Sequence, residues 1–175
     1  IAGIVFNSGT LEDFLLIKYT GTGSTHWFRI NNRTCNFDEF ITASKMDNSG
    51  NYYTSGVIEQ SVSLAGNPIG FGVVEKINSS GALVWSYIDS TLNGNDRYDI
   101  SCNDIAVDNA GNVYITGTAN SKCITTKFNS AGNLLWSNYF DPASSGENAG
   151  SSIAVDALGN VFVCATAYQS VATLQ

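Results

Sequence analysis

The residues best suited to chemistry in this sequence are three aspartates that recur in one setting. Asp47, Asp108 and Asp156 each begin an Asp-x-x-Gly-Asn segment that is followed by aromatic and β-branched residues. An aspartate could bind Ca²⁺, but a calcium loop needs several oxygen ligands close together in sequence. A lone Asp three residues before a glycine is typical of a type I turn, in which backbone amides donate to its carboxylate. We therefore expect turn caps and no metal site.

Other groups that could act in catalysis are few. His26 is the only histidine, and the sequence gives it no identifiable serine and aspartate partners, so a Ser-His-Asp triad cannot be argued. Three carboxylates, which we expect to be exposed, could serve an enzyme only if they converge on one cavity: Glu39, Glu75 and Asp104. We predict no catalytic residue, no metal ligand and no cofactor.

The cysteines do not have the spacing of a zinc site. No two of them form a C-x-x-C pair, and clustered Cys/His ligands are what zinc requires. Two disulfides or buried free thiols are the alternatives, and Cys123 and Cys164 lie within apolar runs that favour burial. The four residues are Cys35, Cys102, Cys123 and Cys164.

Candidate binding residues lie in segments between predicted strands. The densest charged cluster is a candidate ligand-binding loop, with a solvated loop as the alternative; it consists of Asp96, Arg97, Tyr98 and Asp99. Asn32 and Asn78 fit the Asn-x-Ser/Thr pattern of N-glycosylation, and Ser90 fits a pattern of O-glycan attachment. These three are candidate glycosylation sites.

A second motif, Lys-apolar-Asn/Thr-x-x-Gly-x-x-x-Trp, alternates with the aspartate motif. It runs from Lys18 to Trp27, from Lys76 to Trp85 and from Lys127 to Trp136, always with nine residues from Lys to Trp. The glycines keep the same register at Gly23, Gly81 and Gly132. The tryptophans could stack on sugars, but their identical register favours packing between repeated units. The lysines are expected to pair, or to extend along the surface, at equivalent positions.

Each motif predicts a hairpin, and two hairpins make a four-stranded unit of about fifty residues. Gly56 and Gly117, with Ala165 at the third position, follow their aspartates by nine residues. If Gly9 is the first member of this series, the steps are 47, 61 and 48 residues. The long middle step predicts an insertion between strands over residues 57–70.

These motifs resemble the SBBP repeats of bacterial β-propellers. The similarity is close from Ile105-Ala106-Val107-Asp108 to Gly117 and from Ile153 to Val163, and the second half of the repeat is similar from Lys127 to Trp136. Ser44-Lys45-Met46-Asp47 departs most from the pattern. The resemblance implies a propeller fold and a surface or secreted bacterial setting. It implies no activity, because the repeat carries no catalytic residue of its own.

The sequence therefore predicts an all-β fold, a β-propeller of four-stranded antiparallel blades with about three full repeats and partial blades at both ends. A β-sandwich is the rival, but sandwich strands do not recur as identical pairs. The expected repeats cover residues 1–36, 37–92, 93–145 and 146–175. The expected strands occupy four successive positions, a to d, in each repeat. Strand a lies at 37–46, 101–107 and 150–155, and strand b at 4–9, 51–56, 112–117 and 160–166. Strand c lies at 13–19, 71–77, 122–128 and 169–175, and strand d at 25–29, 83–87 and 133–139.

Composition restricts the partners. The formal net charge is −7 with a pI near 4.4, so nucleic acids and anionic membranes are not expected partners. No stretch of 18 apolar residues occurs, which predicts no membrane span. Only 13% of residues are charged, below the roughly 25% of typical soluble domains, and this composition is common in extracellular β-proteins.

We expect a non-catalytic extracellular or cell-surface module that binds a protein or glycan ligand or serves as a scaffold. Two alternatives stay open: a subunit of a surface filament or homo-oligomer, and a propeller enzyme of the glycosidase, lyase or quinoprotein type. The first alternative follows from strands at both ends that are expected to lack a neighbour and that carry few charges or prolines to protect their edges. Such edges predict pairing with the rest of a longer polypeptide or with another copy.

Overall fold

The computed structural model describes residues 2–7, 10–31, 39–62, 68–89, 100–141 and 146–167. All regular structure in these residues is β-strand, and the strands pair antiparallel. The strands are β1 (Ala2–Asn7), β2 (Thr10–Tyr19), β3 (Thr25–Asn31), β4 (Glu39–Met46), β5 (Tyr52–Val62), β6 (Pro68–Ile77), β7 (Leu83–Asp89), β8 (Ile100–Val107), β9 (Val113–Ala119), β10 (Lys122–Phe128), β11 (Leu134–Phe140), β12 (Ala149–Val155) and β13 (Val161–Thr166).

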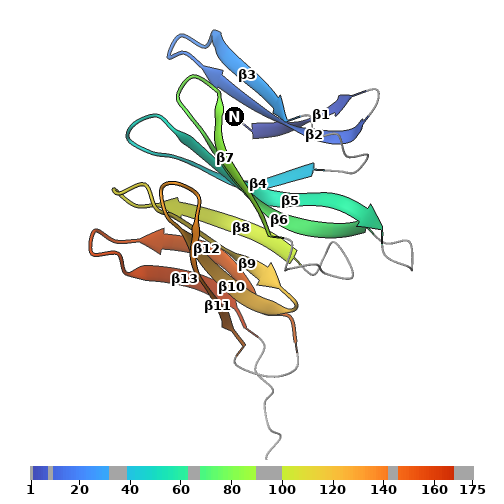
Figure 1. Ribbon diagram of the computed structural model, residues 1–175, viewed down its shortest axis with the longest axis vertical. Coiled ribbons are helices and arrows are strands. Elements are labelled where there is room, and N and C mark those ends of the chain that lie inside the picture. Colours follow the sequence, from blue (N-terminus) through green and yellow to red (C-terminus); the bar gives the residue numbers. More distant parts are fainter. Residues whose placement is uncertain are drawn as a thin grey trace, which may run out of the picture.

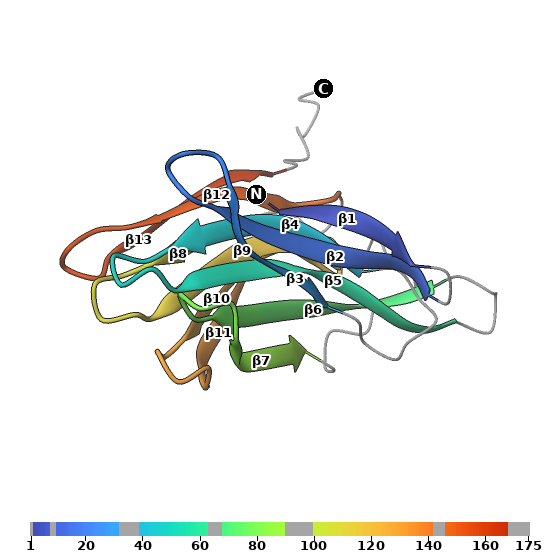
Figure 2. The same ribbon diagram turned by 90° about the horizontal axis from the view of Figure 1, so that it is seen from above.

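These strands form four sheets in chain order, which we name blades. Blade 1 contains β1–β3, blade 2 contains β4–β7, blade 3 contains β8–β11 and blade 4 contains β12–β13. Within each blade the neighbours in space are also neighbours in sequence, so the sheets are simple meanders. The blades follow one another along the long axis (Figure 1) and overlie one another when viewed down it (Figure 2). The predicted fold class, an all-β propeller of antiparallel blades, is confirmed.

The hairpin turns form as their sequence motifs predict. Six turns of the Asp/Asn/Thr-x-x-Gly type occur in the described residues, and the glycine amide of each donates to the carbonyl of the first residue at 3.0–3.1 Å. They lie at one end of the blades, on the left of Figure 1. The strand positions predicted beside these turns are confirmed to within a few residues, except 169–175, which lies outside the described residues.

Two predictions about register are wrong. The expected insertion at 57–70 is mostly strand, because β5 continues to Val62 and β6 begins at Pro68, so the extra residues lengthen an existing hairpin. In addition, pairing in blade 1 places Gly3 opposite Leu15, as Gly56 lies opposite Val73. The counterpart of Gly56 is therefore Gly3 and not Gly9, a choice that sequence spacing alone could not make.

The hydrophobic core lies between successive blades. Between blades 2 and 3 it contains Tyr53 and Val74 from one blade and Cys102, Ile105 and Phe128 from the next. Between blades 3 and 4, Tyr114 packs with Ala106 and Ile153. Because a central blade is covered on both faces, even its polar strand residues can be buried.

Candidate binding surfaces

The repeated aspartates cap their turns. The Oδ1 atom of Asp108 accepts from the amides of Ala110 and Asn112, both at 2.9 Å. Its Oδ2 atom accepts from the Asn112 side chain at 2.8 Å and from the Tyr114 hydroxyl at 3.0 Å. Asp47 makes the same four bonds at its own turn, which confirms the prediction of turn caps.

These hydrogen bonds set the acidity of the aspartates. Burial by itself would raise the pKa of Asp108, but the bonds from Asn112, Tyr114 and Ala110 favour the charged form and lower the pKa below its usual value. The pKa of Asp47 is lowered by the same balance. These carboxylates are therefore ionised and already hydrogen-bonded within the turn, which leaves them poorly suited to proton transfer.

A row of three side chains crosses each complete blade beside the capped turn. In blade 2, Tyr53 lies opposite Lys76, and Lys76 lies opposite Trp85. The Lys76 Nζ atom lies 5.3 Å from the centre of the Tyr53 ring, and the Tyr53 and Trp85 ring centres are 6.4 Å apart. Lysine in this row therefore contacts an aromatic face.

Blade 3 repeats the row with Tyr114, Lys127 and Trp136. The Lys127 Nζ atom lies 4.9 Å from the Tyr114 ring centre, and the two ring centres are again 6.4 Å apart. The expected pairing of these lysines at equivalent positions is thus found, with tyrosine as the partner. In blade 1, the Nζ atom of Lys18 instead donates to the Ser79 carbonyl at 3.3 Å.

Two of the tryptophans join one blade to the next. The Trp27 Nε1 atom donates to the Ser79 carbonyl at 3.1 Å, and the Trp85 Nε1 atom donates to the Ser130 carbonyl at 3.1 Å. A Cβ atom on Gly132 would lie 2.6 Å from the Trp85 ring, so the turn must carry glycine there. The favoured interpretation of these residues as packing groups is confirmed for Trp27 and Trp85.

A second set of contacts between blades was not evident from the sequence. The first strands of blades 2 and 3, β4 and β8, each contain a bulge, and the bulged residues Thr42 and Asn103 reach the next blade. Thr42 Oγ1 donates to the Cys102 carbonyl, and Asn103 Nδ2 donates to the Gly150 carbonyl at 2.8 Å. The two residues differ in type, so no motif marked them.

The expectation that Glu39 and Glu75 are exposed is wrong. Their exposed fractions are 0% and 1%. Glu75 lies between Thr54 and Ser86 in the middle of blade 2, where the position within the stack, and not the charge, decides burial. Asp104 is half-buried, and its Oδ2 atom accepts from Ser152 and from the Ile153 amide, both at 2.8 Å. It therefore joins blade 3 to blade 4.

The described cysteines are free thiols. Cys102 and Cys123 are buried and Cys164 is exposed, so the prediction of burial is right for Cys123 and wrong for Cys164. Burial raises the pKa of Cys102 to about 12, with a further contribution from the charge of Asp89. Burial also raises the pKa of Cys123. Cys35 lies outside the described residues.

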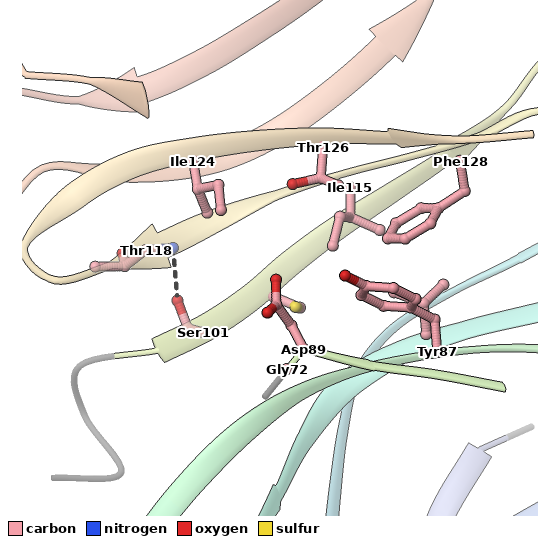
Figure 3. Close-up of a pocket in the computed structure, with 11 residues that line it drawn as sticks. Gly72, Tyr87, Asp89, Ser101, Ile115, Thr118, Ile124, Thr126 and Phe128 are labelled. Atoms are coloured by element: carbon pink, nitrogen blue, oxygen red, sulfur yellow. Dashed lines mark hydrogen bonds between the residues drawn. The ribbon is translucent and has the colours of Figure 1, made fainter. Parts of the chain in front are cut away.

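A small apolar crevice separates blades 2 and 3 at the level of Tyr87 and Phe128, whose ring centres are 4.8 Å apart. Figure 3 shows these two rings facing each other, with Asp89 beside them and the Thr118 amide donating to Ser101. The volume of the crevice is about 20 Å³, so it has room for a water molecule and not for an organic ligand.

Two larger grooves lie at the turn end of the blades. One, of about 240 Å³, runs between the capped turns of blades 2 and 3 and has a polar lining that includes Lys45, Asn48 and Asn109. The other, of about 340 Å³, lies between blades 1 and 2 and is mainly aromatic and apolar, with Tyr19, Trp27, Met46 and Tyr52 in its walls.

The predicted binding loop at Asp96, Arg97, Tyr98 and Asp99 lies outside the described residues, as do Asn32 and Ser90. Asn78 is described, and it begins the turn before Gly81. Its Oδ1 atom accepts from the amides of Ser80 and Ala82 at 3.0 and 2.9 Å. Its side chain thus caps a turn. His26 is exposed at the start of β3.

Within the described ranges, no three His, Cys, Asp or Glu side chains gather closely enough to hold a metal ion. The same residues contain no helix that is long and apolar enough to cross a membrane.

No curated protein matches the chain. The family model SBBP, described as a β-propeller repeat, matches residues 90–122. This segment includes β8 and β9, with the Asp108 turn and Gly117 from which the resemblance was inferred. The chain therefore carries an SBBP β-propeller repeat.

Proposed function

We propose that this chain is a non-catalytic propeller module that acts outside the cell as a scaffold that binds a protein or glycan. The observation that carries the proposal is that the repeated polar residues make their contacts within the fold. Asp47 and Asp108 each accept four hydrogen bonds within their turns, and the lysines and tryptophans of the rows contact aromatic rings or the next blade. The residues that recur serve the fold, which leaves ligand recognition to the loops that differ between blades.

Ligand recognition at those loops fits the general behaviour of rigid repeat scaffolds, in which variable connections present the binding residues. The sequence segment with Asp96, Arg97, Tyr98 and Asp99 combines both charges with an aromatic ring, a composition suited to protein or glycan surfaces. The extracellular setting is proposed from the low content of charged residues and from the similarity to SBBP repeats.

Glycan arrays and pull-downs from extracellular fractions, with the purified chain as the probe, test this proposal. A specific ligand should be retained by the unmodified chain and by a Leu158→Ala control, and lost from a chain in which Arg97 and Tyr98 are both changed to Ala. Reproducible hydrolytic, lyase or redox turnover by the purified chain would overturn the non-catalytic assignment.

A further inference from the structure

The outermost strand of blade 3, β11, is an edge strand. Among the described residues it pairs with β10 alone, and Figure 2 shows it with β7 along the outer side of the molecule. The next described strands, β12 and β13, form the following blade, so this edge is a property of blade 3 itself. An edge strand presents backbone N–H and C=O groups with which a further strand can pair.

The sequence of β11 lacks the features that usually protect such an edge. Its residues, Leu134–Phe140, include no charged side chain and no proline, although charges on an edge discourage strand addition. The equivalent outer strands differ, because β3 contains Arg29 and β7 ends in Asp89. The chain has a formal net charge of −7, so an uncharged edge is a place where two copies can approach with little repulsion.

Two apolar side chains of β11 are exposed on the face toward blade 2. Tyr139 lies opposite Ile124, which lines the crevice between blades 2 and 3. Leu135 lies four residues earlier on the same face of the strand. Leu135 is 52% exposed and Tyr139 is 48% exposed. Both blades that meet on this side contain four strands, so the exposure does not come from an incomplete blade.

The order of residues in β11 is self-complementary about Ser137. When two copies of this strand lie antiparallel with Ser137 opposite Ser137, Leu135 of each copy lies opposite Tyr139 of the other. In the same register Leu134 lies opposite Phe140. Apolar residues therefore meet apolar residues on both sides of the centre. A two-fold axis requires this symmetry, since residue i contacts residue j and j contacts i.

The charge that follows β11 does not oppose this pairing. Asp141 forms an ion pair with Lys122 at 3.6 Å, so its charge is already compensated. By contrast, the same symmetrical pairing of β7 about Ser86 would place Leu83 opposite the carboxylate of Asp89. The pattern therefore favours β11 over the equivalent strand one blade earlier.

We propose that β11 of one copy pairs antiparallel with β11 of a second copy around a two-fold axis at Ser137, so that two blades join into one continuous sheet. Leu135 of each copy packs on Tyr139 of the other across the strand boundary. The contact closes with two copies and does not propagate. A single pair of strands makes a small interface, so the dimer is weak and is mainly dissociated at the low concentrations used for spectroscopy.

Lysine substitutions at two equivalent positions test the contact. Leu135 precedes Trp136 as Val84 precedes Trp85, and Leu135 and Val84 are both 52% exposed. Leu135→Lys places a charge on the proposed interface, and Val84→Lys places the same charge on β7 as the matched control. Far-ultraviolet circular dichroism checks that each variant is folded.

Analytical ultracentrifugation of the full chain from about 1 μM to about 300 μM measures dimer formation. The unmodified chain and Val84→Lys should dimerise toward the upper end of this range. Leu135→Lys should weaken the dimer by about tenfold or more, because each lysine would lose contact with water without gaining a partner.

Disulfide cross-linking tests the register. In a chain with Cys35 and Cys164 changed to serine, Ser137→Cys places two thiols opposite each other, with Cα atoms about 4.5–5.5 Å apart, which suits a disulfide. Leu135→Cys is the control, because its two copies lie four residues apart along the strands, about 13 Å. Mild oxidation should cross-link Ser137→Cys into dimers much faster than Leu135→Cys.

Three results would overturn the proposal. The first is a chain that stays monomeric at every concentration, which would leave the edge of β11 to a strand of another protein. The second is an equal effect of the two lysine variants on dimer formation. The third is cross-linking of Leu135→Cys as fast as that of Ser137→Cys, since the register would then be different.

Discussion

The indole of Trp85 reaches across a blade boundary and donates to the carbonyl of Ser130 at 3.1 Å. Trp27 makes the same bond, at the same length, to Ser79 one blade earlier. The repeat in sequence is thus a repeat of contacts between units and not only of strands within a unit. In such an array each blade depends on its neighbours for burial of its apolar face.

Removal of the Trp85 side chain should therefore destabilise the junction of blades 2 and 3. Trp85→Ala loses an indole that packs on the core cluster around Tyr53 and a hydrogen bond to the next blade. We expect a loss of about 3 kcal/mol in the free energy of unfolding, measured by urea denaturation followed by circular dichroism. Leu135→Ala, at an exposed position of β11, should change it by less than about 0.5 kcal/mol. Equal effects of the two substitutions would contradict the role given to Trp85.

Alanine substitutions at two glycines with the same φ distinguish the cost of backbone strain from the cost of a packing clash. Gly132 and Gly159 both have φ of +85°, but a Cβ atom would lie 2.6 Å from the Trp85 ring at Gly132 and meet nothing within 4 Å at Gly159. Alanine at either position has the cost of a left-handed backbone, roughly 1–2 kcal/mol. Gly132→Ala should destabilise the chain by about 1–3 kcal/mol more than Gly159→Ala, because the ring must move. Indistinguishable denaturation midpoints would show that the ring has free space.

The hydroxyl of Tyr114 should stabilise the fold in a pH-dependent way. It donates to Asp108, and this bond is one of those that lower the pKa of the carboxyl group. Because the folded pKa lies below the unfolded value of about 3.9, this stabilisation is fully present above pH 4 and is lost as the pH falls through the folded pKa. Tyr114→Phe should cost about 1 kcal/mol at pH 7.

At low pH the difference between Tyr114→Phe and the unmodified chain should shrink, since a protonated Asp108 is a weaker acceptor. Denaturation at pH 7 and at pH 3 measures this change. Tyr52→Phe is the matched control, because the Tyr52 hydroxyl donates to the neutral side chain of Ser44 at 2.8 Å. A Tyr114→Phe effect of the same size at both pH values would contradict the link to Asp108.

The sequence predicted the fold well because local motifs determine hairpins. The Asp108 turn, with alternating residues on both sides, allowed β8 and β9 to be placed within two residues of their bounds. The tryptophan contacts between units were also predicted, but the burial and bonding of individual polar residues by other strands and blades were not. The burial of Glu75 depends on its place in the middle of blade 2, and the cross-blade bond of Asn103 depends on a bulge, and neither leaves a local pattern.

The described cysteines should differ in thiol reactivity, because two are buried and one is exposed. Alkylation proceeds through the thiolate, and Cys102 is buried with its pKa raised to about 12, while burial also raises the pKa of Cys123. Cys164 is exposed. Iodoacetamide at pH 8 should therefore modify Cys164 of the native chain rapidly, and should reach Cys102 and Cys123 only at the rate of local or global opening. Peptide mapping by mass spectrometry over time measures each rate, and in denaturant all three should react alike. Native labelling of Cys102 as fast as that of Cys164 would mean that the junction of blades 2 and 3 is open in solution.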